Sequence, residues 1–394
     1  FLMTKNKNEK LYDIAIVGGG LTGKLMASIL VNSGIVPKNK LCWINNENKL
    51  SKDRRVSFIN YKNFLKLTND YKFNFLEKNY LTIDRIEVHN INEKQSLNLE
   101  DRNSHGIIIR NDILKEKINF SENDLVIYKS KVVSTNCHQL QRCLILENEK
   151  KIYASLIISA DGNLSPLRRL TNIQYINHAL DHTIISGYLK CKNFDMTSAK
   201  QIFLKDSFIG LLPYSKNKNI INFVWSLDNQ ILSKNPDFNY YNEIIKRLNY
   251  FFSKDNIDFN ISTSENTNLQ IYPINIKYVK NPFEKRIVLI GDAAHSIHPL
   301  AGQGFNLSIE DCFDILKCLQ NARKIGKDYG EVSVMHEYTN LRRTRNNFIT
   351  FITTILFYIF KKQNNYLNQL INYGLEKLEK TSLKHVFKIL ARGY

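Results

Sequence analysis

The segment GGGLTG at positions 18–23 places glycines at 18, 20 and 23 in the pattern G-x-G-x-x-G. This segment follows the apolar run 13–17 and precedes residues 25–30, whose apolar side chains recur at helical spacing. A strand, a glycine-rich turn and a helix in this order bind the pyrophosphate of a dinucleotide, because the helix N-terminus offers free N–H groups. We expect Gly18 to form the tight turn, Gly20 to let the pyrophosphate approach the backbone, and Gly23 to let strand and helix pack closely.

A second glycine-rich segment, GDAAHSIHPLAGQGFN at positions 291–306, follows the apolar run 287–290. An aspartate at a strand end, here Asp292, can accept hydrogen bonds from sugar or ribityl hydroxyls, and glycines let a helix N-terminus close on a planar ring. A helix dipole directed at a flavin favours the anionic reduced ring by about 0.3 to 2 kcal/mol. The sequence therefore predicts that both segments, from opposite ends of the chain, bind one extended ligand that carries a phosphate and a planar ring.

The histidines of the second segment invite a different interpretation. His295, His298 and the nearby Asp292 could be drawn as a metal cluster. Their place between a strand end and a glycine loop favours a role in ordering that loop, so we assign no metal. We also assign neither histidine the role of a general base, and the catalytic residues stay unknown at this point.

The predicted second strand, residues 40–44, should end in the residue that binds the ribose of the dinucleotide. Asn45 stands there in place of the usual acidic residue, and Glu47 follows closely. An amide can still hydrogen-bond a hydroxyl, so we expect a weaker ribose contact and no loss of binding. The chain has no second G-x-G-x-x-G segment, so a nicotinamide partner, NAD(P)H, is expected to visit transiently.

The segment 291–306 resembles the second FAD motif of the flavin aromatic hydroxylases, and its part HPLAGQGFN is similar to the signature of the ubiquinone-biosynthesis hydroxylase family. The segment DGNLSPLR at 161–168 resembles the motif D-G-x-x-S-x-x-R of these enzymes. Arg55 matches the family's flavin-side arginine, and Arg110 stands at a further flavin-contact position that is more often acidic. The resemblance thus implies that FAD contacts Arg55, Arg110, Asp161, Asp292, Pro299, Gly302, Gly304 and Asn306. Ser308 replaces the usual glycine one helical turn further on, where we do not expect it to prevent FAD binding.

The resemblance also implies an activity. NAD(P)H would reduce FAD, O2 would form a flavin C4a-hydroperoxide, and its distal oxygen would add to the ring of a polyprenylated phenol in ubiquinone biosynthesis. Such a substrate implies a membrane surface, a lipid carrier or an assembly partner. Two alternatives remain open: a hydroxylase of a small soluble aromatic compound, and a flavin-binding assembly subunit that has lost turnover.

Three apolar runs that end in glycine or aspartate must position these residues, namely 13–17, 156–160 and 287–290. Each is typical of a buried parallel strand. Because they lie far apart, we expect an α/β fold with a Rossmann-like FAD-binding domain assembled from discontinuous segments, residues 1–75, 101–176 and 277–330. A mostly antiparallel β-sheet substrate domain would comprise 76–100 and 177–276, and a helical C-terminal region 331–394.

Composition limits the remaining function classes. The 394 residues carry a net charge of +18, but the lysines are scattered and match no nucleic-acid-binding motif, so we expect no nucleic acid partner. The six cysteines have no metal-ligand spacing, and residues 1–10 lack the pattern of a signal peptide. We therefore expect a cytoplasmic protein with reduced thiols.

One apolar stretch in the C-terminal region, residues 348–360, has 13 residues, too few for a transmembrane helix. It is expected to pack in the core or against a partner. The basic residues Arg342, Arg343 and Arg345 before it, with Lys361 and Lys362 after it, would also suit contact with an anionic membrane surface. A peripheral place at a membrane is therefore the second expectation for this stretch.

Overall fold

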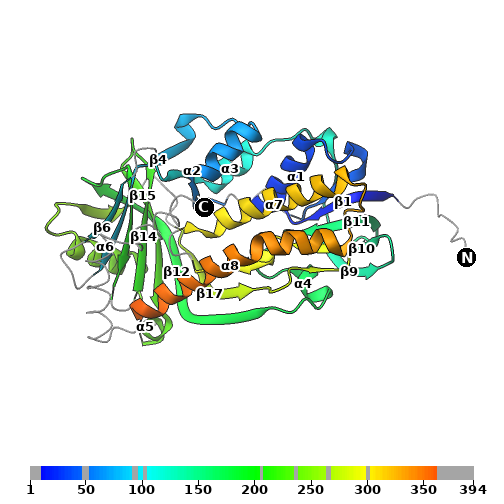
Figure 1. The fold of residues 1–394 in the computed structure, drawn as a ribbon. Helices are drawn as coiled ribbons and strands as arrows, with labels where there is room; N and C mark the ends of the chain where they lie inside the picture. The colour runs from blue at the N-terminus through cyan, green and yellow to red at the C-terminus, as the bar shows by residue number, and fades with distance from the viewer. Residues whose placement is uncertain are drawn as a thin grey trace, which may run out of the picture.

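A computed structural model of the chain describes residues 10–46, 53–90, 96–100, 104–204, 207–234, 238–262, 268–298 and 302–361. Two large sheets lie at opposite ends of the molecule, and the long helices α7 (Gly304–Lys324) and α8 (Val332–Lys361) run beside each other between them (Figure 1). Pro299, Glu47 and the tail from residue 362 lie outside the described residues.

The first sheet has a parallel centre. The order is β18-β19-β11-β1-β2-β8, and the pairs β19–β11, β11–β1, β1–β2 and β2–β8 are parallel. The antiparallel strands β9 and β10 extend it beside β11. The strands are β1 (Leu11–Val17), β2 (Leu41–Ile44), β8 (Val126–Tyr128), β9 (Val132–Cys137), β10 (Arg142–Leu146), β11 (Lys151–Ser159), β18 (Phe283–Glu284) and β19 (Ile287–Leu289). The three apolar runs predicted as parallel strands are confirmed as parts of β1, β11 and β19.

Burial on both faces explains why these runs form the centre of a sheet. The side chains of β1 that face one side pack with helices α1 and α7, and those that face the other side pack with β10 and α4. Both faces are therefore covered, as is usual for parallel strands. The short helices on this part of the chain are α1 (Leu21–Ser33), α2 (Tyr61–Leu65), α3 (Asn111–Lys117) and α4 (Pro166–Leu170). A small antiparallel sheet, β3 (Val56–Asn60), β7 (Gly106–Arg110) and β4 (Tyr80–Ile83), lies beside them.

The second large sheet has the order β20-β17-β12-β15-β14-β13-β5-β6, with β16 paired to β12. Every pair is antiparallel except β13–β5. One face packs against helix α6 (Tyr240–Phe251). The strands are β5 (Arg85–Asn90), β6 (Ser96–Glu100), β12 (Ile176–Lys192), β13 (Ser198–Phe203), β14 (Ser207–Ser215), β15 (Ile220–Asp228), β16 (Asp258–Ile261), β17 (Gln270–Tyr278) and β20 (His295–Ser296), and the helix α5 (Asn229–Lys234) follows β15. The predicted α/β fold with a mostly antiparallel second sheet is confirmed, and the predicted helical C-terminal region is helical over Val332–Lys361, as far as it is described. The exact domain bounds stay a prediction.

Helix α8 joins the two ends of the molecule. Tyr338 packs in the core of the first sheet, and Phe357 packs against Phe208 and other side chains of the second. The apolar stretch 348–360 is therefore partly core: Ile349 and Phe357 are buried, whereas Phe351 is 63% exposed. Among the helices that the structure describes, none combines the length and the low polarity needed to span a membrane.

Candidate functional site

One cavity of about 1660 Å³ receives side chains from both glycine-rich segments and from the second sheet. It lies where the carboxyl ends of β1, β2, β11 and β19 meet, because parallel strands end at the same edge of a sheet. Predicted site residues that line it are Gly20, Arg55, Arg110, Asp292, Gly302 and Gly304. Gly18, Gly23, Asp161 and Asn306 are not among the lining residues.

The turn after β1 shows three different roles for its glycines. A Cβ on Gly18 would overlap the carbonyl oxygen of Ala160, and Gly18 has a φ of +126°. A Cβ on Gly23 would overlap the carbonyl oxygen of Gly18. A Cβ on Gly20, which caps α1, would meet no atom within 4 Å. Gly18 and Gly23 thus permit the close packing of the turn, and Gly20 leaves open space at the helix N-terminus for an anion.

The second segment presents the opposite wall of the cavity. Gly302 packs against Phe58 with a φ of +61°, and Gly304 at the start of α7 leaves the space beside it empty. Asp292 is exposed to the interior of the cavity. The surrounding protein desolvates this carboxyl and raises its pKa, while His295 and Arg55 act in the opposite direction. Because the carboxyl of Asp292 faces the cavity, it can accept hydrogen bonds from the hydroxyl groups of a ligand.

Arg55 is fixed by its neighbour Asp53. Its Nε and Nη2 donate to the two carboxylate oxygens of Asp53 at 2.8 and 2.7 Å, and Asn111 Nδ2 donates to the same carboxylate at 3.0 Å. The hydrogen bonds to Asp53 raise the pKa of Arg55, and Tyr272 of β17 adds to this effect. The guanidinium is therefore a permanent cation at the polar end of the cavity.

Arg110 and Asn45 also line the cavity. Arg110 donates from Nε to Asp112 and from Nη1 to the hydroxyl of Tyr214 at 2.8 Å. Asp112 also lines the cavity, so a carboxylate lies beside the guanidinium of Arg110 there. Asn45 follows directly on β2, as predicted for the residue that meets the ribose.

Two side chains of the segment 161–168, those of Asp161 and Arg168, hydrogen-bond to the protein around them. The carboxylate of Asp161 accepts from Ser159 Oγ at 2.7 Å and from Leu167 N–H at 3.0 Å, so both oxygens are used within the turn. Arg168 is buried and donates to the carbonyl oxygens of Ala293 and Asn163, each at 2.7 Å. The guanidinium of Arg168 therefore links the segment 161–168 to the segment 291–306. This link lies beside the cavity, because Asn163 is one of the lining residues. We propose that Asp161 shapes the turn and contacts FAD only indirectly.

Asn306 joins the start of α7 to β3. Its Nδ2 donates to the carbonyl of Phe58 at 2.9 Å, and its Oδ1 accepts from the N–H of Asn60 at 2.9 Å and from Asn63 Nδ2 at 3.1 Å. Asn306 is 1% exposed. It therefore holds Phe58 against Gly302, and we propose a positioning role where the resemblance implied a ligand contact.

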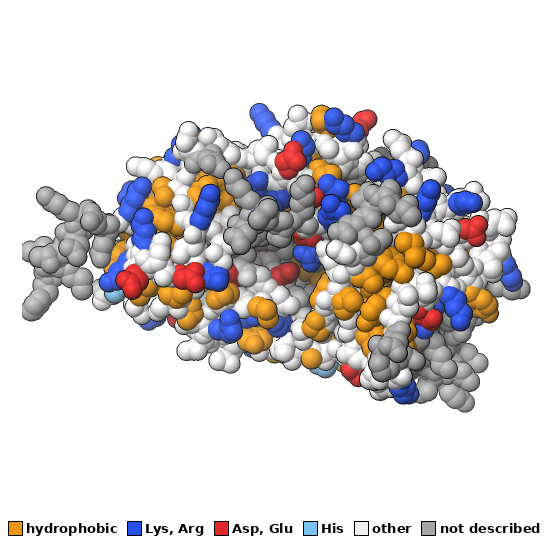
Figure 2. All heavy atoms as spheres, turned by 180° about the vertical axis from the view of Figure 1, so that it is seen from behind, with side chains coloured by type: hydrophobic (Ala, Val, Ile, Leu, Met, Phe, Trp, Pro, Cys, Tyr) orange, Lys and Arg blue, Asp and Glu red, His pale blue; other side chains and the backbone are white. Residues whose placement is uncertain are grey.

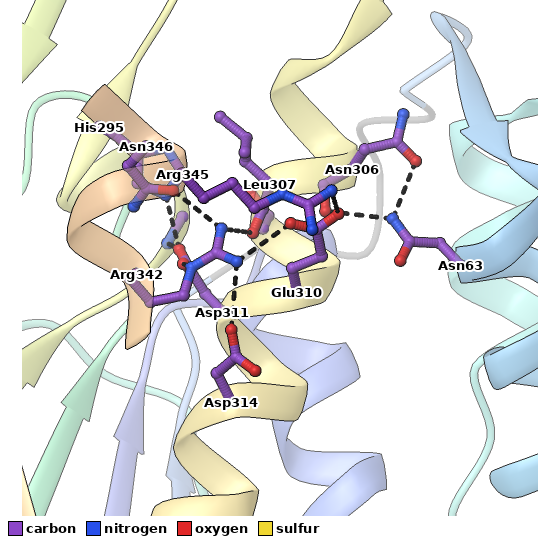
Figure 3. A network of polar contacts seen from close by, with 12 residues as sticks. Asn63, His295, Asn306, Leu307, Glu310, Asp311, Asp314, Arg342, Arg345 and Asn346 are labelled. Atoms are coloured by element: carbon purple, nitrogen blue, oxygen red, sulfur yellow. Dashed lines mark hydrogen bonds and ion pairs between the residues drawn. The ribbon is translucent and has the colours of Figure 1, made fainter. Parts of the chain in front are cut away.

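A buried network of charges supports the second segment from behind, and sequence reasoning missed it (Figure 3). Asp311 of α7 accepts from Gly291 N–H at 2.8 Å, from His295 Nε2 at 2.6 Å and from Arg342 Nε at 2.7 Å. Arg342 also pairs with Glu310 at 3.0 Å. Burial alone would raise the pKa of Asp311, but the charges of His295 and Arg342 lower it to about 2. The loop-ordering role predicted for His295 has this geometric basis.

The network corrects the interpretation of the arginines before the apolar stretch. Arg342 is 2% exposed and Arg345 pairs with Glu310 at 2.5 Å, so the expectation that these two form a basic rim at a membrane surface is wrong. Only Arg343 of the three is exposed. A clue in the sequence was the spacing of Glu310, Asp311 and Asp314, which places three carboxylates along α7 that need a cation once the helix is buried.

Replacing Arg342 with methionine is expected to lower the free energy of unfolding by about 3 to 5 kcal/mol, because it leaves buried carboxylates unpaired. The loop at Gly291 should loosen with it, so FAD affinity should fall as well. Thermal unfolding and FAD titration check both effects. Arg343→Met is the matched control and should behave as the parent protein. An Arg342→Met protein with an unchanged Tm and unchanged FAD affinity would show that the network supports neither the fold nor the FAD site.

His298 gives a prediction on pH. It is fully buried beside Phe208 and Phe357, and burial, reinforced by His182, lowers its pKa from 6.5 to about 3. Between pH 6.5 and about pH 3, His298 binds a proton in the unfolded chain but not in the folded chain. The free energy of unfolding should therefore fall by about 1.4 kcal/mol for each unit of decreasing pH in this range. Asp311 adds a loss in the same direction from 3.8 toward about 2. In His298→Leu the free energy of unfolding should depend less steeply on pH than in the parent protein. The control is His138→Leu, at an exposed position, which should keep the slope of the parent protein. Equal slopes in His298→Leu and the parent protein would contradict this prediction.

The residues present fit FAD. Two helix N-termini, at Gly20 and Gly304, open on the same cavity with empty space where a side chain would stand, and the cation of Arg55 and the carboxylate of Asp292 line this cavity too. The cavity is large enough for an extended ligand, whose pyrophosphate would be held at the N-terminus of α1 and whose hydroxyls would be held by Asp292.

Relatives agree with this assignment. The FAD binding domain model of the family FAD_binding_3 matches residues 142–347, more than half of the chain. The ubiquinone biosynthesis monooxygenase COQ6, mitochondrial, of Dictyostelium discoideum is 23% identical, over 99% of this chain and 92% of that protein. The Homo sapiens protein of the same name is 24% identical, over 93% of this chain and 89% of that protein.

Solved structures share the fold. The p-nitrophenol 4-monooxygenase PnpA from Pseudomonas putida DLL-E4 superposes with a TM-score of 0.73 at 16% identity, over 98% of this chain and all of that chain. A single-residue variant of HpxO from Klebsiella pneumoniae, complexed with FAD, gives a TM-score of 0.72 at 14% identity, over 96% of this chain and 99% of that chain. The chain belongs to the FAD-binding-domain family and is an FAD-dependent monooxygenase of the flavin aromatic hydroxylase type.

Proposed function

We propose that this monooxygenase hydroxylates the aromatic ring of a polyprenylated phenol in ubiquinone biosynthesis, with NAD(P)H and O2 as co-substrates. The observation that carries the proposal is the continuity of the cavity: the space bounded by Gly20 and Gly302 extends along the second sheet. There the wall carries the apolar side chains Ile86, Val88, Leu99, Ile184, Phe203, Leu212, Val224 and Ile274. The names of the relatives, which are ubiquinone biosynthesis monooxygenases, support the same substrate class.

The protein residues divide the work between two ends of the cavity. At one end Gly20, Arg55 and Asp292 would hold the pyrophosphate, the ring system and the hydroxyls of FAD. At the other end the apolar wall would bind the prenyl chain, at about 0.8 kcal/mol for each CH2 group removed from water. Reduced FAD supplies the activated oxygen when bound. The chain's own contribution is to place the phenol ring against the flavin and to keep water away from it.

The substrate also bears on where the protein works. A polyprenylated phenol partitions into lipid, so we propose that the protein receives it at a membrane surface, from a lipid carrier or from an assembly partner. The relatives named above are mitochondrial by name. The face of the molecule seen from behind carries apolar side chains gathered among lysines and arginines, which is a surface that such an encounter could use (Figure 2). Co-sedimentation with anionic and with neutral vesicles, at low and high salt, measures whether the chain contacts a membrane directly. If the chain binds neither kind of vesicle, the substrate must reach it from a carrier or a partner protein.

The test of the activity is substrate-dependent oxidation of NAD(P)H by FAD-loaded protein, with product analysis by mass spectrometry. A phenol with a farnesyl chain should be hydroxylated, and unsubstituted phenol should be a poor substrate. Efficient hydroxylation of phenol alone would favour a hydroxylase of small soluble aromatics. Tight FAD binding with no substrate-stimulated oxidation of NADH or NADPH would favour an assembly subunit without turnover, and would overturn the proposal.

A further inference from the structure

Strand β14 in the middle of the second sheet has two faces with different roles. Ile209 and Leu211 are fully buried on the face that packs with α6. Gly210 and Leu212 lie on the opposite face and line the cavity. The wall of the cavity is therefore built from alternate residues of each strand, as the period of two in a strand requires.

Gly210 leaves a gap in this wall. The register places it beside Gln201 of β13 and Val224 of β15. A Cβ on Gly210 would have Gln201 Oε1 at 3.6 Å and the backbone oxygen and Cβ of Val224 at 3.8 and 4.0 Å, which are ordinary contacts. Its φ is not in the positive range, so neither the backbone nor close packing requires glycine at this position. What the missing side chain changes is the width of the cavity.

The gap lies between two apolar clusters of the wall. On one side Phe203, Phe208 and Val224 pack together, and on the other side Ala199 and Leu212 pack with Phe58. Phe58 in turn contacts Gly302 of the predicted FAD loop. A side chain on residue 210 would project between these clusters and join them.

The position along the sheet separates two parts of the cavity. Tyr272 of β17, which interacts with Arg55, marks the polar end. Three strand spacings separate β17 from β14, about 14 Å at about 4.8 Å for each spacing. Beyond β14 the lining continues with Val88 of β5 and Leu99 of β6. The register places Gly210 in a row of lining residues that crosses the sheet, namely Gln270, Ser186, Val224, Gly210, Gln201 and Val88, so a ligand that extends along this row from β17 to β5 passes residue 210.

We propose that Gly210 is a specificity-determining residue: the gap that it leaves admits the apolar chain of the substrate into the lobe lined by Val88, Leu99 and Phe203. This inference rests on the proposed function, because it assumes that the ring lies at the flavin end. Residue 210 would thus determine whether a phenol that carries an apolar chain can bind.

The test compares binding of two probes, phenol and 2-farnesylphenol, through the change that each causes in the absorption spectrum of bound FAD. In Gly210→Val the Kd of 2-farnesylphenol should rise about tenfold or more, because the new side chain overfills the gap. The Kd of phenol and the FAD content should stay within about twofold of the parent protein. Gly210→Ala should give an intermediate effect. Ser215→Val, on the same strand outside the lining residues, is the matched control and should leave both probes unaffected.

A double variant distinguishes a blocked gap from a general loss of structure in Gly210→Val. Val224→Ala makes room beside residue 210, so Gly210→Val with Val224→Ala should recover most of the affinity for 2-farnesylphenol. The proposal is overturned if Gly210→Val weakens both probes equally, weakens neither, or is not rescued, and also if the parent protein does not bind 2-farnesylphenol. These outcomes are distinct from failure of the proposed function, in which the parent protein binds the probe but forms no hydroxylated product.

Discussion

Gly20→Val is expected to give a folded protein that purifies without FAD. The backbone of Gly20 has φ −67° and ψ −179°, which valine adopts readily, and a Cβ there meets no protein atom within 4 Å. The fold should therefore tolerate the change. The new side chain would fill the space directly over the N-terminus of α1, where the pyrophosphate must approach the N–H groups. The flavin absorbance per chain measures the effect, and we expect it to fall from about one FAD per chain to near zero.

The control for this variant is Asn32→Val on the exposed side of the same helix, which should retain full flavin. Circular dichroism and thermal unfolding should show the same fold in both proteins, apart from the stability that bound FAD confers on the control. A yellow Gly20→Val protein with one FAD per chain would mean that the open space at this turn does not hold the pyrophosphate.

Asp292→Ala is expected to lose FAD and yet be no less stable than the parent protein once both are stripped of flavin. Hydrogen bonds to a charged group contribute about 1.5 to 3 kcal/mol each, so loss of the carboxylate should weaken FAD binding by roughly 10-fold to 150-fold for each bond lost. Desolvation raises the pKa of Asp292, which means that its ionised form destabilises the empty fold at neutral pH. Removing it should therefore leave the Tm of the flavin-free protein equal or higher.

FAD titration and thermal unfolding of the stripped proteins check the two parts of this prediction. The exposed Asp181→Ala serves as the control and should change neither quantity. Unchanged FAD affinity in Asp292→Ala would remove this carboxylate from the binding site. A lower Tm of the stripped variant would show that Asp292 supports the fold, as Asp311 does.

The features that could be predicted from the sequence are those with a local cause. A strand, a glycine turn and a helix are specified within about twenty residues, so the elements around Gly20 and around Asp292 follow from short motifs. Their meeting at one cavity agrees with the rule that parallel strands end at the same edge of a sheet. Gly20 and Gly302 line that cavity, and so does Arg55, which the family resemblance implied.

The features that the sequence did not reveal depend on contacts between distant residues. Arg342 was interpreted as a surface cation because basic residues usually are, and only the packing of α8 on α7 shows that it neutralises Asp311. Asn306 carries a motif position, yet its hydrogen bonds to β3 could not be inferred from spacing. The gap at Gly210 depends on the register of three strands, which periodicity alone does not define.

The most direct test of the central claim is to follow oxygen from O2 into the product. FAD-loaded protein is incubated with NAD(P)H, 2-farnesylphenol and O2 labelled with the heavy oxygen isotope, and the product is examined by mass spectrometry. We expect a ring-hydroxylated phenol that carries one labelled oxygen atom, formed by the parent protein and not by Gly20→Val. Consumption of NAD(P)H with hydrogen peroxide as the sole product, or a hydroxyl group that carries oxygen from water, would contradict it.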